Sequence, residues 1–557
     1  MLEGLDLIGI LKTIFAWNPE QPLTFMHLFF WGFFAIVLLI YSLVYKHNLA
    51  RTTFLLLVSF FFYFKTSGFF IILLFFTITN DYFLGKGIAS AKTIGRKKLF
   101  LTISIVCNLL LLGYFKYAYF FTESFNQLAG TNYPFFNHYA QFSNTYFSTS
   151  FSVGKLILPV GISFFTFQSI SYVIDLYREK VQPVKNILEY GFFVCFFPHL
   201  VAGPIVKAHQ FLYQINLPYK LSKHDFGMAL FWILNGFAKK VLADYAALNY
   251  VDRIFENPNY YSGVEVILGV FGYSLQIYAD FSGYTDIAIG VALLLGFRLK
   301  TNFNSPYKAA STSEFWQRWH ISLSSWLKEY LYIPLGGNKR GSVGSYLCIA
   351  LICSIVILLT GKLWLFFIFA AVAVLLFVFT LIFASFKQVI NTNVNLLVTM
   401  LLGGLWHGSS WMFIIWGALN GLGLVIHKLW QKISPFNESK SVLYRITMIF
   451  ITLVFISFTR IWFRSANLET VGFLFDRMQN HMGWELTWNI LTGYKTVLLV
   501  ILAGYLIHWI PESTKSKYRN FFANLPVPAM AATVVVSVFL LYQAMSSDMQ
   551  PFIYFQF

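Results

Sequence analysis

Charged residues are scarce in this chain. Asp, Glu, Lys and Arg together make up 11% of its 557 residues, whereas soluble globular domains carry about 25%. Apolar residues account for 57% of the chain and aromatic residues for 20%. This balance excludes an ordinary soluble domain and is typical of an integral membrane protein.

Cysteine is also rare, and its placement excludes two common uses. The sequence contains 4 cysteines, all inside apolar runs: Cys107, Cys195, Cys348 and Cys353. No CxxC pair and no histidines at metal-ligand spacing accompany them, so we predict small core residues and no metal site. At the N-terminus, Glu3 and Asp6 precede the first positive charge at Lys12. A cleaved signal peptide starts with basic residues, so we expect the first segments to be retained.

Two motifs of well-known enzyme and pump classes are missing. The chain has no GxSxG nucleophile motif, and Gly361 and Lys362 are followed by leucine instead of the Ser or Thr of a Walker A motif. A self-contained serine hydrolase and an ATP-driven pump are therefore disfavoured. The chain also lacks a soluble domain, a low-complexity linker and an obvious internal repeat, so we predict one membrane domain over 1–557. Its predicted parts are N-terminal transmembrane helices at 1–150, a motif-bearing core at 155–427 and C-terminal transmembrane helices at 428–557.

Long apolar runs stand where charge is missing. Several reach the length of about 18 residues that a helix needs to cross a bilayer. Examples are residues 25–45, 99–121, 156–177 and 264–297. We predict an all-α polytopic membrane protein with about eleven to thirteen transmembrane and re-entrant helices.

Proline and glycine interrupt several of these runs. The interrupting residues are Pro159, Gly161, Pro198, Gly203, Pro204, Gly403, Gly404 and Gly408. A helix break leaves backbone N–H and C=O groups unpaired, which is tolerated at membrane depth only where protein or a water-filled cavity covers them. We therefore expect broken or re-entrant helices around an internal site at these positions.

The formal net charge is +17, carried by short connections between apolar runs. Basic residues cluster at 86–98 and again at 298–340, whereas 122–154 contains no Lys or Arg. Positive connections lie in the cytoplasm of membrane proteins, so we place the first two inside and the third outside. The basic charge thus reports topology and contact with membrane lipid, and it does not predict a nucleic-acid partner.

The stretch Ser311 to Tyr332 is the most informative one. Ser311 and Glu314 have the spacing of a capping box, which predicts a helix start. At helical spacing, bulky apolar residues share one face: Phe315, Trp316, Trp319, Leu323, Trp326, Leu327, Tyr330 and Leu331. His320 falls on that face, which is consistent with an interfacial helix that holds a titratable imidazole toward the protein interior. A core histidine bonded to a neighbour explains the pattern equally well.

His407 lies in a second stretch, residues 401–420, that is otherwise almost entirely apolar. An ionisable group at membrane depth is costly and is therefore a functional hypothesis by default. Gly403, Gly404 and Gly408 permit close approach of backbones, and nearby tryptophans are suited to wall a dry pocket. These are Trp406, Trp411 and Trp416. We favour a functional role for His407 over a structural one.

A third stretch, residues 272–296, places carboxylates inside an apolar run. Its polar members are Asp280, Asp286, Tyr278, Ser282 and Tyr284. A buried carboxylate must be paired, hydrogen-bonded or neutralised. Such a group either orients a histidine or organises a helix break at Gly283, and we favour the structural role. For His199, beside Pro198, we also favour a satisfied structural histidine.

Together these stretches closely resemble the membrane-bound O-acyltransferase family, in particular its bacterial alginate O-acetyltransferase branch. The similarity spans most of the chain, although the first 150 residues match mainly in hydropathy. The matching segments are PVGISFFTFQSISYVID at 159–175, FPHLVAGPI at 197–205, QIYADFSGYTDIAIG at 276–290, FWQRWHISLSSWLKEYLYIPLGGNKRG at 315–341, GGLWHGSSW at 403–411, FTRIWFRSANLE at 458–469 and the terminal PFIYFQF.

The resemblance implies a ring of transmembrane helices around a tunnel in the inner (cytoplasmic) membrane. The family's invariant tunnel histidine falls on His407, and its second essential position falls on His320. The implied activity is acetyl transfer from a cytoplasmic thioester, with acetyl-CoA as donor substrate and no bound cofactor, to an extracytoplasmic polysaccharide.

Roles for individual residues follow from that resemblance and from acyl-transfer chemistry. His407 is the expected general base, because neutral imidazole accepts protons near pH 7. His320 is expected to engage the thioester end of the donor. The expected donor-binding residues are Arg318, Lys328, Lys339, Arg340, Trp316 and Trp319. The expected supporting residues are Asp280, Asp286, Tyr278, Ser282 and Trp406.

Two other functions stay open at this point. One is D-alanyl transfer to a cell-wall polymer, which uses a related scaffold. The other is a proton-coupled transporter whose relay consists of Asp280, Asp286, His320 and His407. The dense acyltransferase motifs argue against the transporter.

The connections at 122–154 and 464–492 are short, about thirty residues each, which is below the size at which a domain folds alone. We therefore expect a separate extracytoplasmic, hydrolase-like acetyltransferase to act as partner, as the resemblance also implies. The aromatic residues of these connections fit either a docking surface or an ordinary aromatic belt at the membrane surface.

Overall fold

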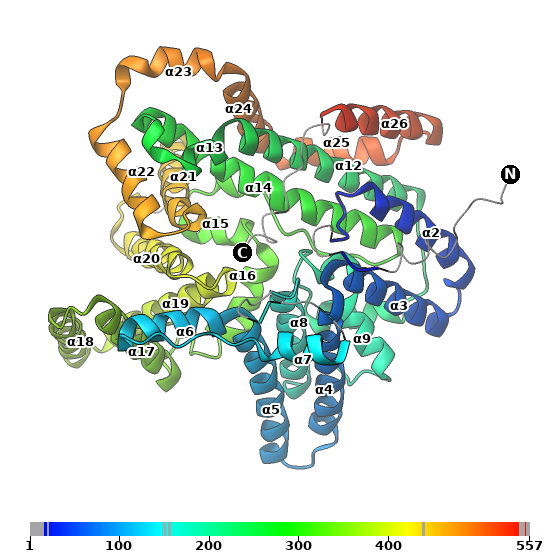
Figure 1. The fold of residues 1–557 in the computed structure, drawn as a ribbon, viewed down its shortest axis with the longest axis horizontal. Helices are drawn as coiled ribbons and strands as arrows, with labels where there is room; N and C mark the ends of the chain where they lie inside the picture. The colour runs from blue at the N-terminus through cyan, green and yellow to red at the C-terminus, as the bar shows by residue number, and fades with distance from the viewer. Residues whose placement is uncertain are drawn as a thin grey trace. The chain divides into compact units, whose positions relative to one another are not determined.

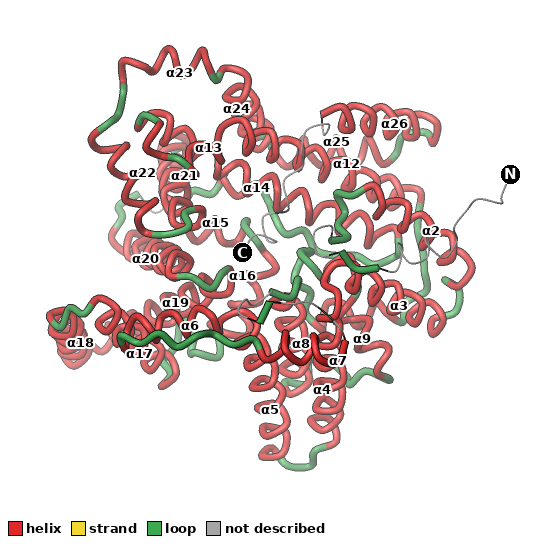
Figure 2. Tube along the Cα trace, in the orientation of Figure 1, coloured by secondary structure: helices red, strands yellow, loops and turns green. Residues whose placement is uncertain are grey.

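The computed structural model describes residues 16–18, 22–147, 149, 152–153, 158–436, 441–544 and 552. Every regular element in these ranges is a helix, and none of the described residues forms a strand (Figure 2). The predicted all-α class is confirmed. The predictions for Glu3, Asp6 and Lys12, and for most of the terminal PFIYFQF motif, fall outside the described residues.

Eight of the described helices are long and apolar enough to cross a membrane. They are Asn48–Ser90, Ile94–Ala129, Lys223–Glu256, Gly263–Leu294, Trp364–Ile382, Phe386–His407, Trp411–Ile433 and Val442–Arg464. The number rises to 10 when each of two bent helix pairs is taken as one span, and two shorter apolar helices accompany them. The chain is therefore a multi-pass membrane protein. With the two shorter helices included, the described residues form 10 to 12 apolar segments, compared with the about eleven to thirteen that the sequence predicts.

The chain forms two compact units. The first comprises Met1–Tyr119, Pro134–Ile233 and Asp286–Leu299, and the second comprises Phe120–Tyr133, Leu234–Thr285 and Lys300–Phe557. Three helices carry residues of both units: α6 (Ala118–Ala129), α12 (Lys223–Ala246) and α14 (Gly263–Leu294).

The first unit is built mainly from the N-terminal helices (Figure 1). They are α2 (Leu28–Val44), α3 (Asn48–Ser67), α4 (Ile71–Ser90), α5 (Ile94–Leu112), α7 (His138–Phe147), α8 (Ile162–Tyr177), α9 (Ile187–Cys195), α10 (Phe197–Leu200) and α11 (Ala208–Ile215). Helices α4, α5 and α8 pack against one another, and α3 packs on α9. The buried carboxylate of Asp81 accepts hydrogen bonds from Ser104 Oγ at 2.6 Å and Asn108 Nδ2 at 2.7 Å. These bonds satisfy a charge-bearing group inside the apolar packing.

Two predicted helix interruptions are present in the first unit. Helix α8 begins only at Ile162, after Gly161 with φ +76°. A Cβ at Gly161 would lie 2.6 Å from the carbonyl oxygen of Leu200, so glycine is required there for space as well as for backbone conformation. Helices α9 and α10 are separated next to Pro198. His199 lies in α10, fully buried, with Nε2 3.0 Å from the carbonyl oxygen of Phe193. Its Nδ1 is buried without a hydrogen-bond partner among the described residues, so the expected satisfied histidine is satisfied at one ring nitrogen.

The second unit contains the remaining helices (Figure 1). They are α13 (Asp252–Glu256), α15 (Thr312–Arg318), α16 (Ile321–Leu327), α17 (Val343–Thr360), α18 (Trp364–Ile382), α19 (Ala384–His407), α20 (Trp411–Ile433), α21 (Val442–Arg464), α22 (Leu468–Asn480), α23 (Thr487–Gly493), α24 (Lys495–Trp509), α25 (Glu512–Ala523) and α26 (Val527–Ala544). Helix α19 packs on α20, and α20 packs on α21.

The predicted break at Gly403 and Gly404 is wrong, because α19 continues through both residues to His407. A Cβ at Gly404 would lie 2.2 Å from the carbonyl oxygen of Phe413, and one at Gly417 would lie 2.5 Å from that of Met400. These glycines therefore let α19 and α20 approach closely. The chain turns only after His407, which places that imidazole at the end of a helix.

The expected helix break at Gly283 is also absent. Helix α14 runs without interruption for 32 residues, from Gly263 to Leu294. A Cβ at Gly283 would lie 2.7 Å from the carbonyl oxygen of Gly236 in α12. Here too the glycine serves close helix packing, a role that hydropathy alone does not distinguish from a break.

Candidate active site

The predicted capping box at the start of α15 is confirmed. Ser311 Oγ accepts a hydrogen bond from the backbone N–H of Glu314 at 3.1 Å. Glu314 Oε2 in turn accepts one from the backbone N–H of Ala310 at 2.8 Å. The first bond satisfies a donor that the first turn of a helix leaves unpaired, and the second holds the residue before the N-cap, so α15 begins at Thr312.

The prediction of one continuous helix over 311–332 is wrong, because the chain breaks at His320. Helix α15 ends at Arg318, His320 has φ 44° and ψ 54°, and α16 starts at Ile321. This left-handed conformation costs a residue with a side chain about 1–2 kcal/mol. Local strain of this kind persists only where surrounding contacts impose it, and it concentrates at functional sites. The break, and not a helix face, sets the direction of the His320 side chain.

Asn302 imposes this conformation. Its backbone oxygen accepts from Ile321 N at 2.9 Å, and its Oδ1 accepts from Ser322 N at 3.1 Å and Ser322 Oγ at 2.9 Å. The same Oδ1 lies 3.2 Å from His320 Nδ1. Because the backbone N–H of Ser322 can only donate, the accepting atom is the amide oxygen, and Nδ1 of His320 must carry a proton. The lone pair of the neutral imidazole is then on Nε2.

Burial keeps the His320 imidazole neutral. The residue has 0% exposure, and desolvation lowers its pKa from the ordinary value of 6.5 to about 3. Neither Asn302 nor Ser322 was singled out as a site residue from the sequence. Asn302 lies in a polar connection where asparagine is common, so only its contacts identify it.

His320 and His407 come together in the structure. Their ring centroids are 6.2 Å apart, and His407 is 3% exposed. Aromatic rings enclose the pair: Trp406 at 5.9 Å and Phe281 at 4.7 Å from His320, and Trp416 at 5.0 Å and Phe463 at 5.4 Å from His407. Two histidines predicted from separate motifs therefore share one buried, water-excluding enclosure.

The tryptophans predicted to wall this pocket divide into two groups. Trp406 and Trp416 lie against the histidines, as expected. Trp411 instead packs on Phe120, with ring centroids 5.3 Å apart. Trp411 is the first residue of α20, and the chain turn between α19 and α20 separates it from His407.

Arg460 is a residue that the sequence reasoning did not assign to the site. It lies on α21, is 1% exposed, and its guanidinium carbon is 4.2 Å from the ring centroid of Trp319 and 5.6 Å from that of Phe463. Phe463 also contacts His407. An arginine at membrane depth was the available signal, but it lay in a motif that was used only for the resemblance.

The carboxylate of Asp280 forms an ion pair with Lys240. Lys240 Nζ lies 2.8 Å from Asp280 Oδ1 and 2.7 Å from Asp244 Oδ1. This pairing joins α14 to α12 and agrees with the favoured structural role. Ser282 is buried on the same helix, and Asp286 is buried in the other compact unit.

Tyr278 joins the aromatic packing next to the histidine enclosure. Its ring centroid is 4.5 Å from that of His508 and 6.5 Å from that of Trp319. His508 Nε2 accepts a hydrogen bond from the backbone N–H of Tyr307 at 3.1 Å. Tyr278 therefore supports the ring that lies beneath Arg460.

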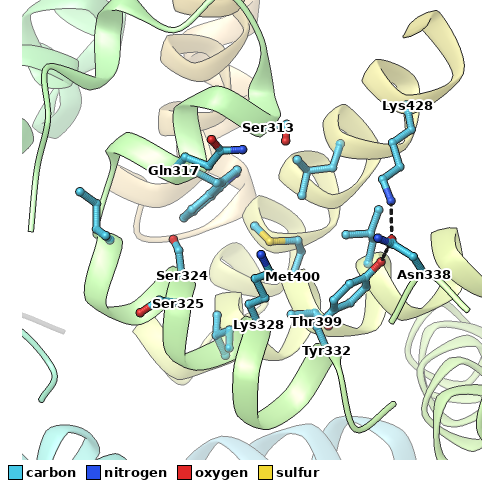
Figure 3. Close-up of a pocket in the computed structure, with 15 residues that line it drawn as sticks. Ser313, Gln317, Ser324, Ser325, Lys328, Tyr332, Asn338, Thr399, Met400 and Lys428 are labelled. Atoms are coloured by element: carbon cyan, nitrogen blue, oxygen red, sulfur yellow. Dashed lines mark hydrogen bonds between the residues drawn. The ribbon is translucent and has the colours of Figure 1, made fainter. Parts of the chain in front are cut away.

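A pocket of about 410 Å³ lies beside α15 and α16 (Figure 3). It is lined by Ser313, Trp316, Gln317, Ile321, Ser324, Ser325, Leu327, Lys328, Tyr332, Asn338, Leu396, Thr399, Met400, Leu424 and Lys428. Two of the predicted donor-binding residues, Trp316 and Lys328, are among them. Lys428 was not predicted, and its Nζ donates to Asn338 Oδ1 at 3.0 Å. The pocket lining thus includes two ammonium groups together with hydroxyl and amide groups.

The other predicted donor residues lie elsewhere. Arg318 forms an ion pair with Glu314 at 2.8 Å and donates to the carbonyl oxygen of Asn304 at 3.1 Å. Trp319 is buried under Arg460 and does not line the pocket. Lys339 and Arg340 are exposed in the loop after α16. Only Trp316 and Lys328 of the predicted set therefore line this cavity.

Comparison with known proteins places these features in context. The sequence pattern of MBOAT, the membrane-bound O-acyltransferase family, matches residues 180–393. A protein of Pseudomonas aeruginosa named "Probable alginate O-acetylase AlgI" is 34% identical over 432 residues, 77% of this chain and 69% of its own. The peptidoglycan O-acetyltransferase of Helicobacter pylori is 32% identical over 71% of this chain and 67% of its own. The teichoic acid D-alanyltransferase of Bacillus subtilis is 25% identical over 50% of this chain and 61% of its own.

Proposed function

Because this chain belongs to the membrane-bound O-acyltransferase family and is an O-acyltransferase, we propose that it moves acetyl groups from acetyl-CoA for O-acetylation of an extracytoplasmic polysaccharide. The observation that carries the proposal is the buried pair of His320 and His407 inside an aromatic enclosure. The acetyltransferase relatives match more of the chain, at higher identity, than the D-alanyltransferase does. This difference favours acetyl over D-alanyl as the group transferred.

The proposed chemistry uses His407 as general base. Its imidazole takes the proton of the acceptor hydroxyl while the hydroxyl oxygen attacks the thioester carbonyl carbon. A carbon–oxygen bond forms, the carbon–sulfur bond breaks, and the departing thiolate receives the proton. Aromatic rings around the two imidazoles exclude water, which suppresses hydrolysis of the thioester.

His320 is proposed to position the thioester end of the donor. Its Nδ1–H is held by Asn302, so the same tautomer is presented in every catalytic cycle. Its low pKa keeps it uncharged at neutral pH. A neutral, fixed imidazole next to the base is suited to orient a polarised acyl group without adding a buried positive charge.

The pocket lined by Lys328 and Lys428 is the proposed donor site. Its volume of about 410 Å³ is within the range of small-molecule sites. Ammonium groups bind phosphates as point charges, and the neighbouring hydroxyl and amide groups add hydrogen bonds. Leu327, which lines the pocket, also approaches Gly403 on α19. The pocket is therefore adjacent to the helix that ends in His407.

The acceptor side of the proposal includes a partner and an inner-membrane location. The connection at 464–492 forms α22 and α23, with Trp484 68% exposed and Trp488 74% exposed. These short elements offer little room for a polysaccharide cleft, so we propose that the acetyl group passes to a separate extracytoplasmic hydrolase-like acetyltransferase. The exposed tryptophans are the proposed docking surface for that partner, or alternatively an aromatic belt.

Reconstitution tests these statements together. Purified protein in vesicles receives labelled acetyl-CoA on one side and a soluble oligosaccharide on the other, with and without the partner. CoA release and acetylated sugar that require the partner support the proposal. Acetylation of the sugar without a partner removes the hand-off, and use of a D-alanyl carrier-protein thioester in place of acetyl-CoA favours the alternative donor. Solute flux without acyl chemistry contradicts the enzyme.

A further inference from the structure

Arg460 carries a buried positive charge that its surroundings leave unbalanced. The residue is 1% exposed, and both Nε and Nη2 lack a hydrogen-bond partner among the described residues. No acidic side chain in the described part of the chain forms an ion pair with it. Arg464, one turn further along α21, is by contrast paired with Asp252 at 3.0 Å. Arg460 interacts with the Tyr307 hydroxyl, which brings no negative charge. A buried guanidinium with two unpaired nitrogens and no carboxylate is costly, so its retention points to an anionic ligand that arrives from outside.

The location of Arg460 connects it to both histidines. Arg460 and Phe463 lie three residues apart on α21, and therefore on one face of the helix. The guanidinium carbon is 5.6 Å from the Phe463 ring centroid, and that centroid is 5.4 Å from His407. Arg460 also covers Trp319, the residue directly before His320. Phe463 thus lies near both the guanidinium and the proposed base.

Other donors around the enclosure are also unsatisfied. Nε1 of Trp416 is buried without a partner in the described residues, and the Trp416 ring lies 5.0 Å from that of His407. Nδ2 of Asn302, the residue that holds His320, is likewise buried without a described partner. Each of these groups donates hydrogen bonds. Donors without acceptors around one enclosure indicate a site that receives a negatively charged oxygen.

We propose that Arg460 is a catalytic residue that, together with the Trp416 indole N–H, binds the acyl oxygen as it becomes an oxyanion. This inference rests on the proposed acyl transfer. When the acceptor oxygen bonds to the carbonyl carbon, the π electron pair of the carbonyl moves onto its oxygen, and the acceptor proton goes to His407. Collapse of the intermediate restores the carbonyl and expels the thiolate, which takes the proton. Arg460 stabilises the charge at its maximum and undergoes no covalent change.

A structural role for Arg460 on Trp319 makes the opposite prediction about stability. If the cation over the ring held α21 in place, Arg460→Met would lower the melting temperature and the activity together. If the charge serves an incoming oxyanion, its removal relieves an unpaired buried cation, and the melting temperature stays constant or rises. We expect Arg460→Met to lower kcat about 10²–10³-fold, with the donor KM within about threefold. Arg464→Met is the matched control, and it should reduce stability while kcat remains near wild type.

The experiment has one arm with catalysis and one without it. In the first, single-turnover acetyl transfer is measured for wild type, Arg460→Met, Arg460→Lys and Arg464→Met. In the second, acetate serves as the anionic probe, and melting temperatures in acetate are compared with those in chloride at equal ionic strength. Acetate should stabilise wild type and Arg464→Met but not Arg460→Met.

The outcomes separate this inference from the proposed function. One possible result is that acetate raises the melting temperature only when Arg460 is present, while the wild-type protein shows no acyl transfer. This result supports the anion site and contradicts the proposed function. Normal transfer by Arg460→Met, or a parallel loss of stability and activity in that variant, overturns the catalytic role and leaves the function standing. If Arg460→Met does not fold, Arg460→Lys decides. A stable lysine variant with reduced kcat supports the inference, and one with normal kcat overturns it.

Discussion

Two buried polar clusters in the second compact unit differ in how their charges are balanced. In one, Lys240 lies between Asp244 and Asp280, so that carboxylates surround the ammonium. In the other, His320 and His407 lie inside aromatic rings, Arg460 lies against Trp319 and Phe463 beside them, and no described carboxylate pairs with Arg460. The first cluster links α12 to α14 and is complete in itself. The second lacks a described carboxylate to balance its cation and keeps Nε and Nη2 of Arg460 unpaired, as a binding site for a developing negative charge requires.

The largest expected effect comes from His407. His407→Ala removes the proposed base, so acyl transfer should fall about 10³-fold or more, because general base catalysis contributes about 10²–10⁴-fold. The measurement is CoA release under single-turnover conditions, with membrane insertion and melting temperature as checks on folding. Near-normal acetylation by a well-folded variant would remove His407 from the chemistry.

Replacement of Lys240 should lower stability and leave activity intact, the opposite of what we expect for His407. Lys240→Met leaves Asp244 and Asp280 buried without their cation, and breaking a buried ion pair in this way costs about 3–5 kcal/mol of stability. Transfer per folded molecule should stay close to wild type, because Lys240 bonds these two carboxylates and does not line the histidine enclosure. Thermal unfolding and active-site titration measure the two quantities separately. If the Lys240→Met protein were stable but inactive, the Lys240 cluster would belong to the functional site and the distinction between the two clusters would be wrong.

Substitutions in the donor pocket should raise the KM for acetyl-CoA and leave kcat unchanged. Lys328→Ala and Lys428→Ala each remove one cation from the pocket wall, and we expect the acetyl-CoA KM to rise about five- to tenfold, which corresponds to about 1–1.4 kcal/mol. Lys432→Ala is the matched control, since it removes the same charge one turn further along α20 at an exposed position. If Lys328→Ala and Lys428→Ala have the same acetyl-CoA KM as the control Lys432→Ala, this cavity is not the donor site.

The smallest expected effect is a pH dependence of stability. Burial lowers the pKa of His320 from 6.5 to about 3 in the folded protein. Between these two pH values the imidazole is protonated in the unfolded chain and neutral in the folded protein. Stability should therefore fall as the pH drops below about 6.5, by about 2 kcal/mol between pH 7 and pH 5. His320→Asn lacks this titration, keeps a donor toward Asn302 and tolerates the left-handed backbone. Melting curves of the variant should be flatter over this interval, and an identical slope would contradict the assignment.

Much of the architecture was predictable because membrane insertion depends on local properties. The length and composition of apolar runs predicted the helices, and the Ser311–Glu314 spacing predicted the start of α15. His407 was recognised because an imidazole in an apolar run is unusual in itself, and His320 because it falls on the apolar face of an amphipathic pattern, where a core histidine explained it equally well. Glycines were interpreted less successfully, since the same residue signals a helix break or a close helix contact. Gly283 and Gly404 serve contacts, and only the opposing backbone shows this.

The sequence by itself determined that this protein is an all-helical membrane protein with two exceptional histidines, because hydropathy and ionisable groups at membrane depth are properties of short segments. Only the tertiary structure decided that His320 and His407 face each other, since their motifs lie on different elements. The backbone break at His320 depends on hydrogen bonds that Asn302 accepts from Ile321 and Ser322, which local helix propensity does not register. The absence of a described carboxylate beside Arg460 is likewise a property of its neighbours on several helices, which the sequence around Arg460 does not reveal.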